Sequence, residues 1–296
     1  MSALLASAPS APEAAGLGLS CQHLSSGYHR VKVLDDVTFS VREPSVYVVL
    51  GPNGAGKTTL FRTLAGILEP LTGSVSIDGR PLEEQATRDR LHFLSHIDGI
   101  PDGLRVEEAL RLYASILHAS ERDVDRVVET LAIGPLRQKF FSELSAGQKK
   151  RVSVARIFLR ERDYYLLDEP TANLDPKVAM EIRDLVLKLS RQKVVLYSSH
   201  NLFEAREIGT YVLALKGGKL ALFDRIADLR SSHYTVGVRA YQGEELLPAS
   251  NLRGDYHLYE LSGPEEVAGL VQDLETRGVK LREVREMGNP LEDLFT

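Results

Sequence analysis

Alternating apolar and polar residues characterise the chain after its first eighteen positions. Between residues 19 and 42, Val31 and Val33, and then Val37 and Phe39, stand two positions apart. Successive side chains of a strand point to opposite faces, so a period of two places these residues on one face. We therefore expect short, half-buried β-strands at the start of the fold.

Continuous apolar runs, typical of strands buried on both faces, punctuate the next two hundred residues or so. The runs lie at residues 46–50, 164–167 and 194–197, and further strands are expected at residues 74–78 and 90–95. Residues 176–190 have helical spacing and separate the last two strands, which is the arrangement of a parallel βαβ unit. The pattern predicts an α/β core.

In two other regions the spacing of apolar residues differs from that of the buried strands. Residues 106–118 and 123–131 carry apolar residues three and four positions apart, so a helical insertion is expected from His96 to about Arg160. From residue 231 onward the pattern predicts a small α+β C-terminal domain. Its elements are strands at 234–241, 256–261 and 280–286 and a helix at 264–277.

Composition narrows the class of protein and partner. The chain has 296 residues, enough for one large and one small domain, and 36 Lys and Arg against 41 Asp and Glu give a formal net charge of -5. No broad basic surface is expected, and therefore no nucleic acid partner. The basic run Lys149 to Arg151 is interpreted as a solvated helix face.

The cysteine count and the length of the apolar segments indicate where in the cell the protein is found. Cys21 is the only cysteine, which excludes an intrachain disulfide and fits the reducing cytoplasm. No segment reaches the roughly 18 apolar residues of a membrane-spanning helix. Residues 1–18 lack the positive region of a signal peptide and are expected to form a disordered tail.

The segment GPNGAGKT at residues 51–58 matches GxxxxGK[ST] between a predicted strand and a predicted helix. Glycines allow backbone N–H groups to cradle phosphates, and Lys57 would lie beside the β- and γ-phosphates. The Thr58 hydroxyl is a suitable Mg²⁺ ligand. The expected nucleotide contacts are Gly51, Pro52, Asn53, Gly54, Ala55, Gly56, Lys57, Thr58 and Thr59.

Two acidic residues follow the buried strand at 164–167. Asp168 and Glu169 would stand at the carboxyl end of the sheet, where α/β proteins bind ligands. Asp168 could hold Mg²⁺, and Glu169 could deprotonate an attacking water. An acidic pair by itself is more often a solvated turn, and beside a phosphate loop it also fits a kinase or GTPase.

The run LSAGQ at residues 144–148 distinguishes these alternatives. By itself it is a helix start with Ser145 as its cap. Together with the phosphate loop and the segment YYLLDEP, it resembles the nucleotide-binding subunit of ABC transporters. The resemblance implies that Ser145, Gly147 and Gln148 contact the nucleotide held by the opposite subunit. Ala146 stands where the family normally has glycine, a small departure.

The resemblance extends from about residue 19 to residue 230 and implies further roles. Tyr28 matches the aromatic residue that stacks on adenine, although alone it would be ordinary core or edge. Asp175, otherwise a helix cap before Pro176, matches the loop that contacts the partner subunit. His200 matches the switch histidine that hydrogen-bonds the γ-phosphate, and with Glu169 and Lys57 it forms the implied catalytic set.

One position departs from the family. His96 stands where the family pattern has a glutamine that touches Mg²⁺ and the attacking water. Imidazole is a poorer Mg²⁺ ligand, so turnover could be altered. The alternatives are a shifted alignment in this loop or a bridging water.

The predicted fold is a P-loop ABC ATPase core at 19–230 with an antiparallel β subdomain and a helical subdomain at about 96–160, followed by the α+β domain at 231–296. The ending NPLEDLF resembles ATPase subunits of the ABC-2 export type; the domain could otherwise cover a sheet edge or widen a dimer interface. The resemblance implies a cytoplasmic, membrane-peripheral subunit that uses Mg-ATP.

Its implied partners are an integral membrane permease and a second ATPase subunit, identical or paralogous. The alternatives are a soluble ABC ATPase acting as a mechanical switch without a permease, and a nonhydrolysing scaffold. A tandem cassette or a coiled coil would favour the switch, and the chain has neither.

Overall fold

A computed structural model describes residues 18–95, 99–172, 174–229, 234–241, 252–287 and 291. The expected disordered tail lies outside these residues, except for Gly18. No helix in the described part of the chain is long and apolar enough to cross a membrane.

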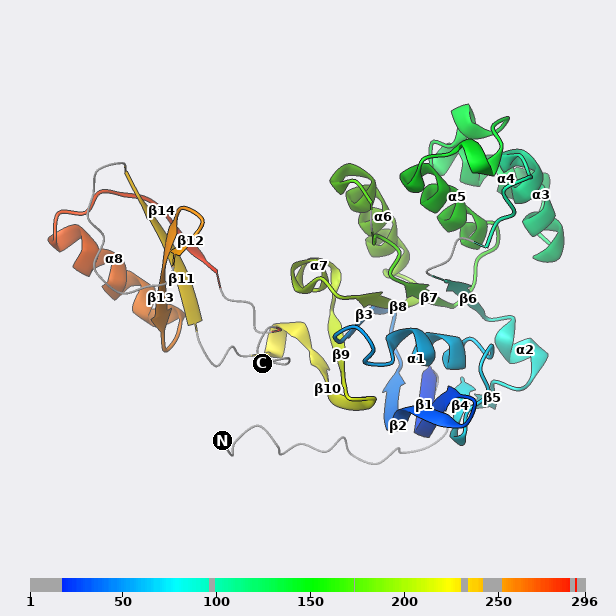
Figure 1. The fold of residues 1–296 in the computed structure, drawn as a ribbon, viewed down its shortest axis with the longest axis horizontal. Coiled ribbons are helices and arrows are strands. Elements are labelled where there is room, and N and C mark those ends of the chain that lie inside the picture. The colour runs from blue at the N-terminus through cyan, green and yellow to red at the C-terminus, as the bar shows by residue number, and fades with distance from the viewer. Residues whose placement is uncertain are drawn as a thin grey trace.

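A six-stranded sheet forms the centre of the larger part of the molecule (Figure 1). Its order is β10-β9-β3-β8-β7-β6, and all neighbours are parallel except β10 and β9. The strands are β3 (Ser45–Leu50), β6 (Leu91–Leu94), β7 (Tyr164–Asp168), β8 (Val194–Ser199), β9 (Tyr211–Lys216) and β10 (Lys219–Arg225). The predicted parallel α/β core is confirmed. The hairpin of β9 and β10 was not predicted.

Apolar side chains cover both faces of this sheet, because alternate residues of each strand enter different clusters. Tyr47 and Leu166 pack toward α1 (Lys57–Leu64), whereas Val48 and Leu167 pack toward α6 (Pro176–Leu189) and α7 (Leu202–Ile208). Burial on both faces explains the uninterrupted apolar runs in the sequence. This packing also holds in place the ends of the strands, where polar residues follow.

The alternating N-terminal segment forms an antiparallel sheet beside α1. Its order is β2-β1-β4-β5, with β1 (Leu19–Tyr28), β2 (Val31–Val41), β4 (Thr72–Ile77) and β5 (Arg80–Pro81). The short helix α2 (Gln85–Arg88) then leads to β6. The strand prediction for this region is confirmed.

Helices fill the predicted insertion. They are α3 (Val106–Ile116), α4 (Glu121–Thr130), the 3-10 turns η1 (Gly134–Leu136) and η2 (Phe141–Glu143), and α5 (Ala146–Phe158). They share an apolar cluster that includes Leu110 and Val127. The interpretation of the basic run as a solvated helix face is wrong, because Lys150 is only 6% exposed and Arg151 is paired with Glu181 of α6.

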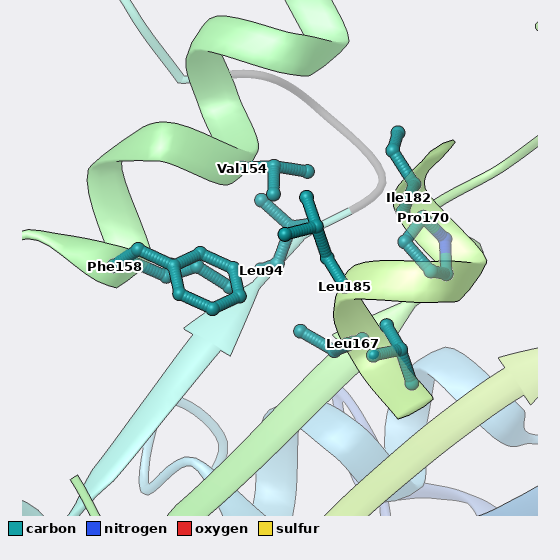
Figure 2. A pocket seen from close by; sticks show the side chains of 9 residues that line it. Leu94, Val154, Phe158, Leu167, Pro170, Ile182 and Leu185 are labelled. Carbon is teal, nitrogen blue, oxygen red and sulfur yellow. The ribbon is translucent and has the colours of Figure 1, made fainter. Parts of the chain in front are cut away.

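A small apolar hollow lies where α5 and α6 meet β6 and β7 (Figure 2). Its lining residues are Leu94, Val154, Ile157, Phe158, Leu167, Pro170, Ile182, Leu185 and Val186. None of them offers a charged or hydrogen-bonding side chain. The hollow is therefore part of the packing between the helical layer and the sheet, and its lining does not suit the charged phosphates of the predicted nucleotide.

The C-terminal residues form a separate antiparallel sheet that stands to one side in Figure 1. After η3 (Ile226–Asp228) come β11 (Tyr234–Ala240), β12 (Leu252–Arg253), β13 (Tyr256–Leu261), η4 (Pro264–Glu266), α8 (Val267–Thr276) and β14 (Leu281–Glu286). The sheet order is β12-β13-β11-β14, and Val236 and Val238 pack with Leu274 of α8. Leu291 belongs to the core cluster under α7 and is fully buried.

Candidate functional site

The phosphate-loop segment joins β3 to the start of α1. Gly54 and Gly56 have φ angles of 80° and 102°, values that residues with a Cβ rarely adopt. A Cβ on Gly51 would lie 2.7 Å from the carbonyl oxygen of Leu215. The three glycines are therefore required by the backbone path itself, as the predicted cradle demands.

Lys57 is the first residue of α1 and is buried at the base of this loop. Its Nζ donates hydrogen bonds to the carbonyl oxygens of Gly51 at 2.7 Å and Pro52 at 3.3 Å. Burial lowers the pKa of Lys57, and the charges of Glu169 and Asp168 offset part of this effect. A poorly hydrated ammonium group near a helix N-terminus is a strong point of attraction for phosphate.

Asp168 and Glu169 stand at the carboxyl end of β7, as predicted. Asp168 is 1% exposed, and its Oδ1 accepts a hydrogen bond from Ser198 Oγ at 2.7 Å. Its Oδ2 has no hydrogen-bond partner within the described chain. Glu169 adopts a φ of 47°, a left-handed conformation that is costly for a residue with a Cβ and is typical of functional sites.

His200 lies beside Glu169, which confirms that the two segments meet. The strand pairing places Asp168 opposite Ser198, and His200 follows β8 directly. His200 Nδ1 is 3.3 Å from Glu169 Oε1. A half-exposed imidazole and a carboxylate at this separation can both reach one water molecule.

The LSAGQ run begins α5 as the sequence predicts. Ser145 is the N-cap; its Oγ accepts from the Gln148 amide at 3.3 Å, and Gln148 Oε1 accepts from the Ser145 amide at 3.1 Å. Within the described chain, no hydrogen bond or ion pair connects this turn to the phosphate loop. Each of the two segments is held by hydrogen bonds within itself.

The remaining predicted residues have less defined surroundings. Tyr28 ends β1, is 36% exposed, and its hydroxyl accepts a hydrogen bond from Arg62 Nη1 at 3.1 Å. Asp175 is exposed at the N-cap position of α6, yet its side chain makes no cap hydrogen bond there. His96 lies outside the described residues, so its proposed contact with Mg²⁺ stays a prediction.

Comparison with known proteins identifies the family. A family model described as "ABC transporter" matches residues 34–172. The chain is 30% identical over 258 residues to the Nod factor export ATP-binding protein I of Cupriavidus pinatubonensis, covering 85% of this chain and 78% of that protein. The chain belongs to the ATP-binding proteins of ABC transporters.

Other comparisons agree with this assignment. The uncharacterized ABC transporter ATP-binding protein YhcH of Bacillus subtilis is 28% identical over 279 residues, covering 89% of this chain and 90% of that protein. A solved ATP-binding subunit of an ABC transporter superposes with a TM-score of 0.67 at 28% identity, over 72% of this chain and 92% of that one. As an ABC ATPase, the chain binds and hydrolyses ATP.

The structure of this ABC ATPase also shows polar residues that the sequence patterns did not single out. Ser198 contacts both acidic residues, and Glu204 on α7 is buried among three hydroxyl groups. A Ser-Ser pair directly before His200 was visible in the sequence. Glu204, however, sits in an ordinary amphipathic helix pattern, and only the fold shows what it contacts.

Proposed function

We propose that this ABC ATPase closes as a head-to-tail dimer around two Mg-ATP molecules and drives a separate membrane permease. The observation that carries the proposal is the meeting of Glu169 and His200 at the carboxyl ends of β7 and β8. Phosphoryl transfer depends mainly on positioning and charge stabilisation, and this edge of the sheet supplies both.

Glu169 is proposed as the general base and His200 as the group that helps hold the attacking water. Their side chains are 3.3 Å apart, and the left-handed backbone of Glu169 aims the residue out of the strand direction. Lys57 and the loop amides would stabilise the charge on the phosphates. Each of these groups binds or orients a reactant, and Glu169 alone accepts a proton.

The residues also fit a magnesium ion. Asp168 Oδ2 is buried without a hydrogen-bond partner among the described residues, and carboxylate oxygen is a preferred Mg²⁺ ligand. Thr58 could add its hydroxyl. The described residues hold no cluster of three His, Cys, Asp or Glu side chains suited to a metal. We therefore propose that Mg²⁺ binds together with the ATP phosphates, whose charge it would neutralise.

The exposed start of α5 supports the shared site. The helix geometry leaves the amides of Ala146 and Gly147 without an intrahelical acceptor, and Ser145 is exposed. A helix N-terminus attracts anions, so this turn would bind the γ-phosphate held by a second subunit. Gln148 would lie beside it, and Asp175 would contact the same partner.

We further propose residues 19–230 as the ATPase domain and residues 231–296 as a C-terminal domain of the ABC-2 export type. The Nod factor relative carries "export" in its name and aligns over 85% of this chain. The subunit would act at the inner face of the membrane through its permease. Tyr28 would stack on the adenine ring.

The test is the solution mass of Glu169→Gln with and without Mg-ATP. Removing the base should trap the ATP-bound state while leaving its phosphate contacts, so a monomer should become a dimer only with ATP. The double variant Glu169→Gln with Lys57→Ala is the control, since it should stay monomeric. A mass indifferent to ATP, despite measured nucleotide binding, would contradict autonomous closure of the dimer.

A further inference from the structure

A buried carboxylate lies behind the edge of the sheet that carries Glu169 and His200. Glu204 is in the first turn of α7 and is 7% exposed. Burying a carboxylate is costly unless several donors compensate it. The groups that donate hydrogen bonds to Glu204 therefore show which parts of the chain this carboxylate holds together.

Three hydroxyl groups face this carboxylate. Its Oε1 accepts hydrogen bonds from Thr171 Oγ1 at 2.5 Å and from Tyr197 OH at 2.8 Å. Its Oε2 accepts one from Ser199 Oγ at 2.7 Å. Arg183 of α6 lies 3.7 Å from Oε1 and brings a positive charge beside the carboxylate.

The positions of these donors connect the network to the reaction. Thr171 is two residues after Glu169, and Ser199 is the residue directly before His200. The Thr171 and Tyr197 hydroxyl oxygens also lie 2.8 Å from each other, so the two groups converge on the same carboxylate oxygen. One buried side chain thus contacts the two chain segments that deliver the proposed base and the proposed switch histidine.

We propose that Glu204 is a positioning residue for ATP hydrolysis, which fixes the separation of Glu169 and His200 by binding both of their segments. In this role it acts through Thr171 and Ser199 and not on a reactant directly. The inference rests on the roles proposed above for Glu169 and His200. A small displacement of groups that hold an attacking water can cost about 100-fold in rate, so a fixed separation has catalytic value.

The experiment compares Glu204→Leu, Glu204→Gln and Thr171→Val in the full chain. Leu removes all three acceptor contacts and should lower kcat by about 10- to 100-fold. ATP affinity should change by less than about twofold, because the phosphate loop is untouched. Gln should restore most of the rate, since its amide oxygen can accept two hydroxyls and its NH₂ can donate to Ser199.

Thr171→Val keeps the shape of the side chain and removes only one link. It should lower kcat about tenfold, and it decides the question if Glu204→Leu does not fold. Tyr164→Phe is the matched control. It removes a partly buried 2.7 Å hydrogen bond from a tyrosine hydroxyl to the Asp78 carboxylate, at the opposite end of β7.

The outcomes separate positioning from general stability. Loss of kcat in Glu204→Leu and Thr171→Val, rescue by Glu204→Gln, and a wild-type rate in Tyr164→Phe would support the proposal. An unchanged kcat, an equal loss in Tyr164→Phe, or a parallel loss of ATP affinity would overturn it. Glu169→Gln, assayed beside them, tests the proposed base: if that variant hydrolyses ATP at the wild-type rate, the proposed function fails first.

Discussion

The hydroxyl group of Ser198 accepts a hydrogen bond from the backbone amide of Glu169 at 2.8 Å. The same hydroxyl donates to Asp168 Oδ1 at 2.7 Å, so one side chain of β8 holds both acidic residues of β7. Ser198 has no exposed surface. The contact fixes the backbone of Glu169 in its left-handed conformation and orients the Asp168 carboxylate, whose Oδ2 has no hydrogen-bond partner among the described residues.

Ser198→Ala should therefore slow hydrolysis without preventing nucleotide binding. Losing hydrogen bonds worth about 1 to 2 kcal/mol should lower kcat by about tenfold, measured at saturating Mg-ATP. Ser20→Ala serves as the control, since it removes a serine–serine hydrogen bond of 2.9 Å in the antiparallel sheet. Equal rates for wild type and Ser198→Ala would show that Glu169 holds its geometry unaided.

Replacing Tyr28 tests the adenine contact. Base–aromatic stacking contributes about 1 to 3 kcal/mol, so Tyr28→Ala should weaken ATP binding by roughly 5- to 100-fold. Tyr28→Phe keeps the ring, loses only the hydrogen bond from Arg62, and should bind nearly as well as wild type. Affinity for tripolyphosphate, which lacks a base, is the internal control. If Tyr28→Ala weakens both ligands equally, the ring does not contact adenine.

Gly147→Ala tests whether the start of α5 serves a second subunit. A Cβ there would meet Val178 at 3.5 Å, an ordinary contact, and alanine favours helix, so the single chain should keep its melting temperature or gain slightly. ATPase activity should nevertheless fall, because the methyl group would crowd the γ-phosphate of the opposite site. Gly134→Ala, where a Cβ meets open space, is the matched control. Full activity in Gly147→Ala would indicate that the γ-phosphate of the opposite site does not come close to residue 147.

Sequence patterns could predict the candidate site because its main residues are either adjacent in the sequence or lie at the ends of neighbouring strands. Lys57 follows its glycines directly, and the parallel order of β7 and β8 makes the meeting of Glu169 and His200 a consequence of topology. The network of Glu204 was not predictable in this way. Its partner Thr171 is 33 residues away, and their contact depends on how α7 packs behind the sheet.

Burial was also harder to predict than element type. Lys150 belongs to a basic run at the start of an amphipathic helix, yet it is buried because α5 is covered on more than one side. His92 is a second example. It alternates with apolar residues on β6, and only the layers above the strand explain why its ring has almost no contact with water.

His92 should make stability depend on pH. Its ring is 6% exposed, and Nε2 lies 2.7 Å from the carbonyl oxygen of Arg160. Burial lowers the pKa of His92 to about 4, and the positive charges of Arg162, Arg156 and Arg160 act in the same direction. In the unfolded chain the pKa of His92 is near 6.5. Between pH 6.5 and 4, His92 is therefore protonated in the unfolded chain and neutral in the folded chain.

The free energy of unfolding should consequently be unaffected by His92 above pH 6.5 and decrease as the pH falls below it. The expected slope is about 1.4 kcal/mol per pH unit, or about 2 kcal/mol by pH 5. His92→Gln keeps an N–H donor for Arg160 but cannot take up a proton, so its stability should lack this loss. Urea unfolding of both proteins at pH 7, 6 and 5 measures the difference directly. Parallel curves across that range would mean that the folded protein admits a charged imidazole at this position.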